Sequence, residues 1–366
     1  MTKKIVSIVV MVVVVISAVI WAAMSNRPND AGQSAQKVVK IGLAIPLTGN
    51  LAFIGEPERK SAELALIDAG NTRYKYDLVF EDSQFSPVLA ASAASKLINV
   101  DKVLAIIDFG SGIGDAIAPI AEKSQVAHFS LASDPTAAVG RYNYIHWTPP
   151  FKEGELLVKE LKKGGYKKIS IIDTNHPGTL AVTNSVKEGI KGSGIEITSY
   201  DLTNVGDKDF RTIIGKIKKA GPDIVILEMF SPEIEIAARQ MKELGMKTPV
   251  TSVETFEWSD QSSLFEGDWF ISDAVTTGFN EKYKTAYGSD PKPGSSYVYD
   301  LVTFLIKLQE NSSEPIEAKD LPDVISKIGT YSSPVFGEIK IDKDGFFITE
   351  PSVKIIKDGK AVLVTQ

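Results

Sequence analysis

The sequence contains no cysteine and only three histidines among its 366 residues. Without cysteine there is no disulfide, thiolate nucleophile, thiolate metal site or lipid-modified cysteine. Three motifs of catalytic and nucleotide sites are also missing: the G-x-S-x-G elbow, the Gly-x-x-x-x-Gly-Lys loop and H-E-x-x-H. We therefore expect neither an enzyme nor a metal or cofactor.

The histidines occupy two kinds of position. His128 and His146 each lie in a short apolar stretch that is typical of a strand, so we predict packing roles for both. His176 follows a predicted strand, in the loop 173–178, where it is placed to meet a ligand.

Basic residues do not dominate the chain, whose formal net charge is −6. A nucleic-acid partner requires a clustered basic surface, so none is expected. The length of 366 residues exceeds what one hydrophobic core usually serves, which is about 250 to 300 residues. Two domains are therefore predicted.

The N-terminus has the pattern of an export segment. Lys3 and Lys4 precede Ile5–Met24, a stretch without a charged residue. The stretch has the length of a membrane-spanning helix, yet small residues near its end suit signal-peptidase cleavage, so both a cleaved signal and a retained anchor remain open. We assign 1–25 to this segment and 26–38 to a linker, with the rest of the chain outside the cytoplasm.

Short β-branched runs alternate with helical patterns from Val39 onward, which is typical of βαβ units around parallel sheets. A second series with the same order follows 147–150, and helices and hairpin-like strands close the chain. The predicted strands are 39–45, 76–80, 103–107, 127–129, 168–172, 196–200, 224–228, 250–252, 337–341, 352–357 and 361–364. The predicted helices are 57–69, 87–98, 114–123, 179–191, 210–219, 232–244, 280–287, 297–308 and 318–328.

A glycine-rich stretch, Gly110–Gly114, follows one predicted strand and opens a helix. Free backbone N–H groups at a helix start favour an anion. The spacing G-x-G-x-G is not that of a dinucleotide-binding loop, so a carboxylate site is favoured over a cofactor phosphate. A tight turn without a ligand is the alternative.

Several segments together resemble the branched-chain amino-acid (leucine/isoleucine/valine-type) periplasmic solute-binding proteins of ABC transporters. The resemblance covers nearly all of 39–366, and the order and spacing of the segments carry it. The segments are Ile41–Gly49, Ala52–Gly55, Phe80–Ser83, Leu97–Ile98 with Val103–Ile107, Ala118–Glu122, Ala132–Pro135, Tyr299–Leu301 and Phe336–Asp342.

The resemblance implies an α/β fold of the type I periplasmic binding class, with two doubly wound parallel-sheet lobes joined by three crossovers. The ligand would bind between the lobes, which agrees with the rule that ligands sit beyond the carboxyl ends of parallel strands. We assign 39–148 with 273–337 to lobe 1, and 149–272 with 338–366 to lobe 2.

The resemblance also implies binding residues for an amino acid. Ser111 and either Ser133 or Asp134 would hold the ligand carboxylate, while a backbone carbonyl at Leu131 or Ala132 would accept from the ammonium. Glu254 would supply the acidic partner of that ammonium. Walls would come from Phe53 or Ile54, His176 or Pro177, and Phe230, where the family usually has a tyrosine.

The predicted function is capture of an amino acid or amino-acid-like molecule and its delivery to an ABC transporter permease. A ligand-sensing ectodomain, or a binding protein for another small carboxylate or amide, is the alternative. The predicted partners are the small-molecule ligand, the permease and, through the N-terminal segment, the membrane; we expect a monomer.

Overall fold

The computed structural model describes residues 36–259, 261–275 and 277–364. The predicted export segment 1–25 and all but the last three residues of the predicted linker 26–38 lie outside these ranges. Within them, no helix combines the length and the hydrophobicity that crossing a membrane requires.

The first sheet has five strands in the order β2-β1-β3-β4-β5. β1 pairs with β3, β3 with β4 and β4 with β5, all in parallel. Every residue of β3 and β4 is buried, as expected for parallel strands covered on both faces. The bounds are β1 Val38–Ile45, β2 Lys75–Asp82, β3 Ala105–Phe109, β4 Ala127–Leu131 and β5 Asn143–Ile145.

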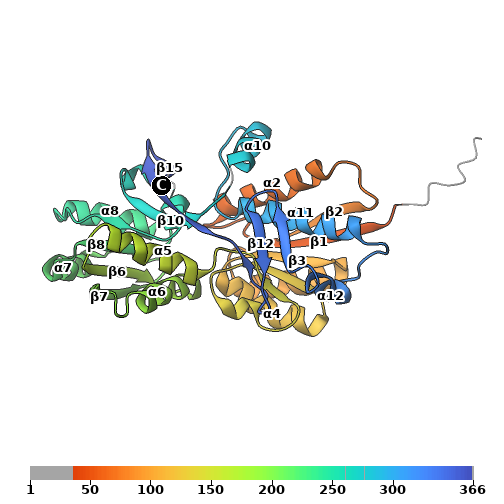
Figure 1. Cartoon of the computed structure of the whole chain (residues 1–366), viewed down its shortest axis with the longest axis horizontal. Helices are drawn as coiled ribbons and strands as arrows, with labels where there is room; N and C mark the ends of the chain where they lie inside the picture. Colours follow the sequence, from red (N-terminus) through yellow and green to blue (C-terminus); the bar gives the residue numbers. More distant parts are fainter. Residues whose placement is uncertain (1–35, 260, 276, 365–366) are drawn as a thin grey trace, which may run out of the picture. The chain divides into compact units, whose positions relative to one another are not determined.

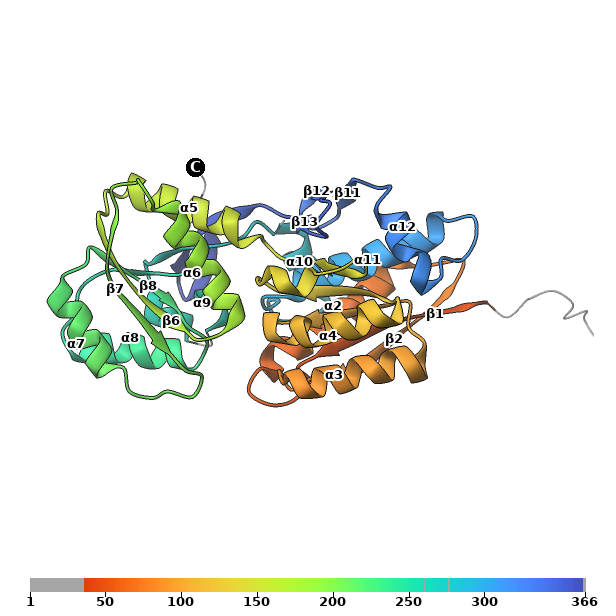
Figure 2. The ribbon, with the colours of Figure 1, turned by 90° about the horizontal axis from the view of Figure 1, so that it is seen from below.

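Helices cover this sheet on both faces (Figure 2). Alanines of α3 and isoleucines of α4 pack with Ile106 of β3 in one buried cluster, while α2 packs against α11 (Figure 1). The helices are α2 Ala52–Ala69, α3 Pro87–Lys96, α4 Ser111–Ser124 and α11 Ser295–Asn311, with a π turn at Leu97–Asp101 and a 3₁₀ turn at Pro135–Ala138.

The second sheet has the order β7-β6-β8-β9, and its pairs are also parallel. Its helices include α5, which the sequence analysis did not predict; α5 packs against α6. The bounds are α5 Pro150–Lys163, β6 Lys168–Thr174, α6 Pro177–Gly189, β7 Glu196–Thr203, α7 Arg211–Ala220, β8 Ile224–Glu228, α8 Glu233–Glu243 and β9 Val250–Thr251. The prediction of two doubly wound parallel sheets is confirmed.

The C-terminal third adds two small antiparallel sheets, β10-β14-β15 and β11-β12-β13. Its first strands and helices are α9 Thr255–Trp258, a 3₁₀ turn Ser262–Phe265, β10 Trp269–Asp273, α10 Thr277–Tyr287, a 3₁₀ turn Ala318–Asp320 and α12 Leu321–Ile325. The remaining strands are β11 Thr330–Ser333, β12 Gly337–Ile341, β13 Phe347–Ile348, β14 Pro351–Lys357 and β15 Lys360–Leu363.

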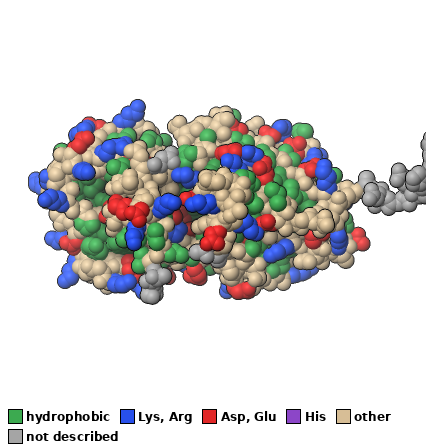
Figure 3. Space-filling view, turned by 90° about the horizontal axis from the view of Figure 1, so that it is seen from above, with side chains coloured by type: hydrophobic (Ala, Val, Ile, Leu, Met, Phe, Trp, Pro, Cys, Tyr) green, Lys and Arg blue, Asp and Glu red, His purple; other side chains and the backbone are tan. Residues whose placement is uncertain are grey.

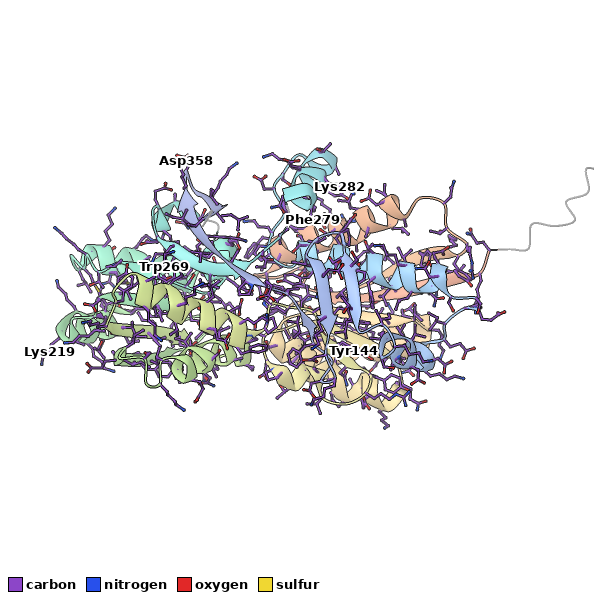
Figure 4. The ribbon with its side chains drawn as sticks, in the orientation of Figure 1. Tyr144, Lys219, Trp269, Phe279, Lys282 and Asp358 are labelled. Atoms are coloured by element: carbon purple, nitrogen blue, oxygen red, sulfur yellow. The ribbon has the colours of Figure 1, made fainter. Side chains whose placement is uncertain are left out.

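Aromatic contacts attach this region to the first sheet. Phe347 of β13 packs edge-on against Phe129 of β4 at 5.9 Å. Tyr144 of β5, which is labelled in Figure 4, stacks on Phe129 at 5.1 Å. Phe279 of α10, also labelled there, packs against Tyr299 of α11 at 5.2 Å. The segment around β13 therefore shares the core of the first sheet.

Most predicted helices differ from the observed ones by a few residues at one or both ends, and two differ more. The single helix predicted at 318–328 is wrong. A 3₁₀ turn at Ala318–Asp320 leads into the five-residue α12, and Gly329, four residues after α12, has φ 65°. The helix predicted to start at Pro57 begins five residues earlier, at Ala52, so Pro57 lies inside the helix, where proline is usually unfavourable.

Charges of both signs are mixed on the face drawn in Figure 3, where Lys and Arg side chains are interspersed with Asp and Glu.

Candidate functional site

Loops from both sheets meet around one small cavity, which we call the binding cavity. Its volume is about 40 Å³. It lies at the carboxyl ends of the parallel strands, where open α/β sheets place their ligands. Among the residues that line it are Phe85, Phe109, Gly110, Ser111, Leu131, Ser133, Trp147, His176, Gly178, Glu228, Phe230, Val253, Glu254 and Trp258.

Ser111 stands at the start of α4, directly after β3. Gly110 precedes it with φ 107°, and a side chain there would come within 2.4 Å of the Phe85 ring, so this turn requires glycine. The Ser111 hydroxyl oxygen accepts hydrogen bonds from the backbone N–H groups of Ser133 and Asp134, both at 3.1 Å. The glycine-rich turn thus presents a hydroxyl and two loop N–H groups in one place.

A second helix start reaches the same hydroxyl. A Cβ atom on Gly178, in the first turn of α6, would lie 3.0 Å from Ser111 Oγ. His176 caps α6, because its Nδ1 accepts the N–H of Gly178 at 3.2 Å. The N-termini of α4 and α6 therefore converge, and two helix dipoles favour an anion at Ser111.

His176 is a neutral donor in this arrangement. With Nδ1 accepting a hydrogen bond, the ring proton resides on Nε2. Burial lowers the pKa of His176 to about 4, although the charge of Asp134 opposes the shift. Nε2 would lie 3.8 Å from a Cβ atom on Gly112, so the N–H is close to the start of α4. The predicted placement of His176 near a ligand is compatible with this geometry.

Glu254 stands on the opposite side of the cavity, next to α9, with φ 62°. Glu254 is 7% exposed, and its Oε2 accepts a hydrogen bond from the indole N–H of Trp147 at 3.0 Å. Burial raises the pKa of Glu254 to about 8, and the charges of Asp273 and Glu257 add to the effect. A cation brought to this carboxyl would favour its ionised form.

Two further carboxyl groups lie close by. Glu153 of α5 is fully buried, and burial together with the neighbouring Glu254 raises its pKa well above the ordinary range. Burial also raises the pKa of Glu228, even though its Oε2 accepts the backbone N–H of Val253 at 3.1 Å. This side of the cavity is acidic, whereas the Ser111 side offers donors.

Aromatic rings form the rest of the wall. Phe85 stacks on His176 with centroids 5.8 Å apart, and it contacts Phe109 and Phe230 at 6.1 and 6.4 Å. Its backbone has φ 55°, a conformation that costs an aromatic residue about 1–3 kcal/mol. Strain of this kind persists where the surrounding structure holds the residue in place.

Six of the predicted site residues line the binding cavity: Ser111, Leu131, Ser133, His176, Phe230 and Glu254. Asp134 and Pro177 instead line a separate groove of about 730 Å³. There the Asp134 carboxylate accepts the N–H of Thr136 at 2.9 Å, so it caps a turn. Ala132 is buried without lining either space, and Phe53 and Ile54, on α2, line neither.

Four residues in or beside the site were not predicted from the sequence: Phe85, Trp147, Glu153 and Trp258. Phe85 follows β2 and Trp147 follows β5, so the rule of the carboxyl edge would have selected both. Trp147, Glu254 and Trp258 also line a larger cavity of about 440 Å³, together with Phe279 of α10.

The chain is similar to a known protein family. A family model described as periplasmic binding protein matches residues 38–353. The chain belongs to this family. It is therefore a solute-binding protein and not an enzyme, and the family acts outside the cytoplasm.

The relatives agree with the predicted resemblance. Leu/Ile/Val-binding protein homolog 2 of Brucella abortus is 25% identical over 327 residues, which cover 84% of this chain and 87% of that protein. Leucine-binding protein LivK of Thermotoga maritima has a TM-score of 0.81 at 24% identity, covering 89% of this chain and 98% of its own. LivJ of Streptococcus pneumoniae, solved with isoleucine, has a TM-score of 0.80 at 22% identity, with the same coverage of both chains. The structural matches confirm the fold.

Proposed function

We propose that this protein captures an amino acid, or a similar molecule with a carboxylate and an amine, and delivers it to an ABC transporter permease. The observation that carries the proposal is the polarity of the binding cavity. Donors converge at Ser111 on one side, and the carboxyl groups of Glu228 and Glu254 stand on the other. A zwitterion matches both sides at once.

The ligand carboxylate would lie at Ser111, between the N-termini of α4 and α6. Ser111 Oγ already accepts two N–H groups, which leaves its own proton free to donate. The amine would lie at Glu254. The isoleucine complex of LivJ and the name of the Brucella relative support an amino acid as the ligand class.

Binding requires the walls to move apart. A volume of about 40 Å³ holds one or two water molecules, whereas an amino acid needs more than about 100 Å³. Since Phe85 and Ser111 come from the first sheet and Phe230 and Glu254 from the second, a hinge motion between two lobes would open the cavity.

We propose that the lobes divide close to the predicted bounds, with one change. Residues 338–349 belong with lobe 1, because β12 pairs with β11 and Phe347 packs on Phe129. β14 pairs with β10 instead, so the division falls near residue 350.

The apolar segment 5–24 would export the protein and then either be cleaved or tether it. Mass spectrometry of the protein from the cell envelope separates the two outcomes: a mass without 1–25 identifies a signal, and the full mass an anchor. A single species at the monomer mass in sedimentation would support the expected monomer.

Calorimetric titration of the full chain with a panel of amino acids tests the function. We expect micromolar or tighter binding of at least one, and a loss of at least tenfold in Ser111→Ala and Glu254→Gln. Phe151→Leu, at an exposed residue outside the cavity, is the control. No heat and no thermal shift with any amino acid or short amide would overturn the proposal.

A further inference from the structure

Three aromatic rings surround the Glu254 side of the binding cavity. Phe109 ends β3, Trp147 follows β5 and Trp258 ends α9. The centroid of Phe109 lies 6.1 Å from that of Trp147 and 5.6 Å from that of Trp258, and the two indoles are 6.4 Å apart. The faces of such rings attract cations through their quadrupoles, most strongly in tryptophan.

The acceptors for a primary ammonium in this place include the carboxyl groups of Glu228 and Glu254. Four other lining residues, Gly110, Leu131, Phe230 and Val253, have backbone carbonyls that already accept a backbone N–H. A primary ammonium has three N–H donors, and each donor left unpaired on burial costs free energy. Methylation removes these donors while the charge remains.

The charge of the cavity suits a cation. Glu228 and Glu254 line it, and among the described residues no Lys or Arg does. The Trp147 N–H is directed to Glu254, and Tyr297 stacks on this indole at 4.4 Å, so the ring is held in position. A cation would meet aromatic faces and carboxylates together.

Trp258 is the ring that is best placed to move aside. It ends a four-residue helix, and its indole N–H is buried without a hydrogen-bond partner in the described part of the chain. Its displacement would break no hydrogen bond that the structure shows. Like Trp147 and Glu254, it lines both the binding cavity and the larger space of about 440 Å³.

We infer that the cationic end of the ligand is a methylated ammonium, held by the faces of Phe109, Trp147 and Trp258 beside Glu254. This inference rests on the proposed function, because the carboxylate end still binds at Ser111. It narrows the ligand class to N-methylated amino acids and betaines. The aromatic walls then bind the charged group itself and not only an apolar side chain.

Calorimetric titration of the full chain with four probes tests this inference. Trimethylglycine carries the methylated ammonium, glycine the primary ammonium, and leucine a primary ammonium with a branched side chain. The fourth probe, 3,3-dimethylbutyrate, has the shape of trimethylglycine without its positive charge. We expect trimethylglycine to bind at least tenfold more tightly than each of the other three.

Variants show which groups are responsible. Trp258→Leu should weaken trimethylglycine at least tenfold and 3,3-dimethylbutyrate less than threefold, because leucine keeps apolar contact but has no π face. Phe151→Leu, which alters an exposed aromatic residue outside the cavity, should leave both affinities unchanged.

The outcomes separate the inference from the function. Leucine or glycine binding more tightly than trimethylglycine would overturn the methylated ammonium and leave the amino-acid receptor standing. Equal affinity for trimethylglycine and 3,3-dimethylbutyrate would show an apolar wall and also overturn it. If neither trimethylglycine nor any amine of the wider amino-acid panel binds, the proposed function fails together with the inference.

Discussion

The indole N–H of Trp147 donates a hydrogen bond of 3.0 Å to the Glu254 carboxylate, which links a residue that follows the first sheet to one that follows the second. A hydrogen bond to a charged group is about twice as strong as a neutral one. It stabilises the ionised form of Glu254, against the burial that disfavours it.

Affinity for a cationic ligand should therefore depend on pH through Glu254. With a pKa of about 8 before binding, Glu254 is mostly protonated at pH 6, and the ligand must displace that proton. We expect calorimetric affinity to rise about tenfold per pH unit from pH 6 and to level off above pH 8. Glu254→Gln should bind weakly at every pH. A flat profile in the unaltered protein would contradict this role.

Other ionisable groups near Glu254 come from five elements and also affect its titration: Glu153 on α5, Glu228 on β8, Glu257 on α9, Asp273 on β10 and Tyr297 on α11. Lys354 pairs with Asp273 at 2.9 Å and with Glu257 at 3.0 Å, so these two carboxylates are partly compensated. Trp147→Phe removes the N–H donor and should move the rise in affinity to higher pH.

Glu153→Gln should remove a loss of stability at high pH. Burial raises the pKa of Glu153, so the folded protein keeps a proton that the unfolded chain releases above about pH 4.5. The free energy of unfolding therefore falls as pH rises from that value. In urea unfolding we expect the stability of Glu153→Gln relative to the unaltered protein to increase from pH 6 to pH 9.

The matched control for Glu153 lies two residues away on the same helix. Glu155 is exposed, so Glu155→Gln should change the free energy of unfolding by less than about 0.5 kcal/mol at any pH. A destabilisation of Glu153→Gln that is equal at pH 6 and pH 9 would contradict the titration.

At position 85, substitution by glycine should destabilise the fold less than substitution by alanine. The backbone there has φ 55°, which glycine adopts freely and alanine does not. We expect Phe85→Gly to be more stable than Phe85→Ala by about 1 kcal/mol in urea unfolding. Phe151, in the first turn of α5, should show the reverse order, because glycine weakens a helix. The same order at both positions would exclude strain at Phe85.

The buried contact of His128 with Asp108 should matter for stability and not for binding. Both residues are fully buried, and His128 Nε2 contacts the Asp108 carboxylate while Nδ1 lies 2.8 Å from Asn143 Oδ1. His128→Gln should lower the free energy of unfolding by about 1–3 kcal/mol, since the buried Asp108 oxygen that contacts Nε2 loses this partner and only the hydrogen bond from Ser130 to the other oxygen remains. Titration of the variant under native conditions should show ligand affinity within twofold of the unaltered protein; a tenfold loss would assign His128 to the site.

The sequence predicted the parallel strands well, because each is a buried run of β-branched residues between turns, as in Ile224–Glu228. It missed α5, where Gly154 opposes a helix locally; this glycine packs so closely on α6 that a Cβ atom would lie 2.3 Å from Ser185. β10 was missed because its partner, β14, lies about eighty residues further on.

The residues of the site, like the elements of the fold, could be predicted only in part. Ser111 and Glu254 follow strands in segments with family resemblance, so the sequence could select them. Trp258 lies in a short helix, and only the packing of Phe109 and Trp147 against it places it in the cavity. Glu153 could not be selected either, since its burial depends on how α5 packs.

The left-handed backbone of Phe85 has a consequence for engineering. Enlarging a binding site usually lowers stability, because filled volume is replaced by a void. At this position the two effects partly oppose each other: glycine widens the site and at the same time relaxes a strained peptide segment. Phe85 is therefore a position at which a biosensor built on this scaffold could be broadened toward bulkier analytes at a reduced thermodynamic cost.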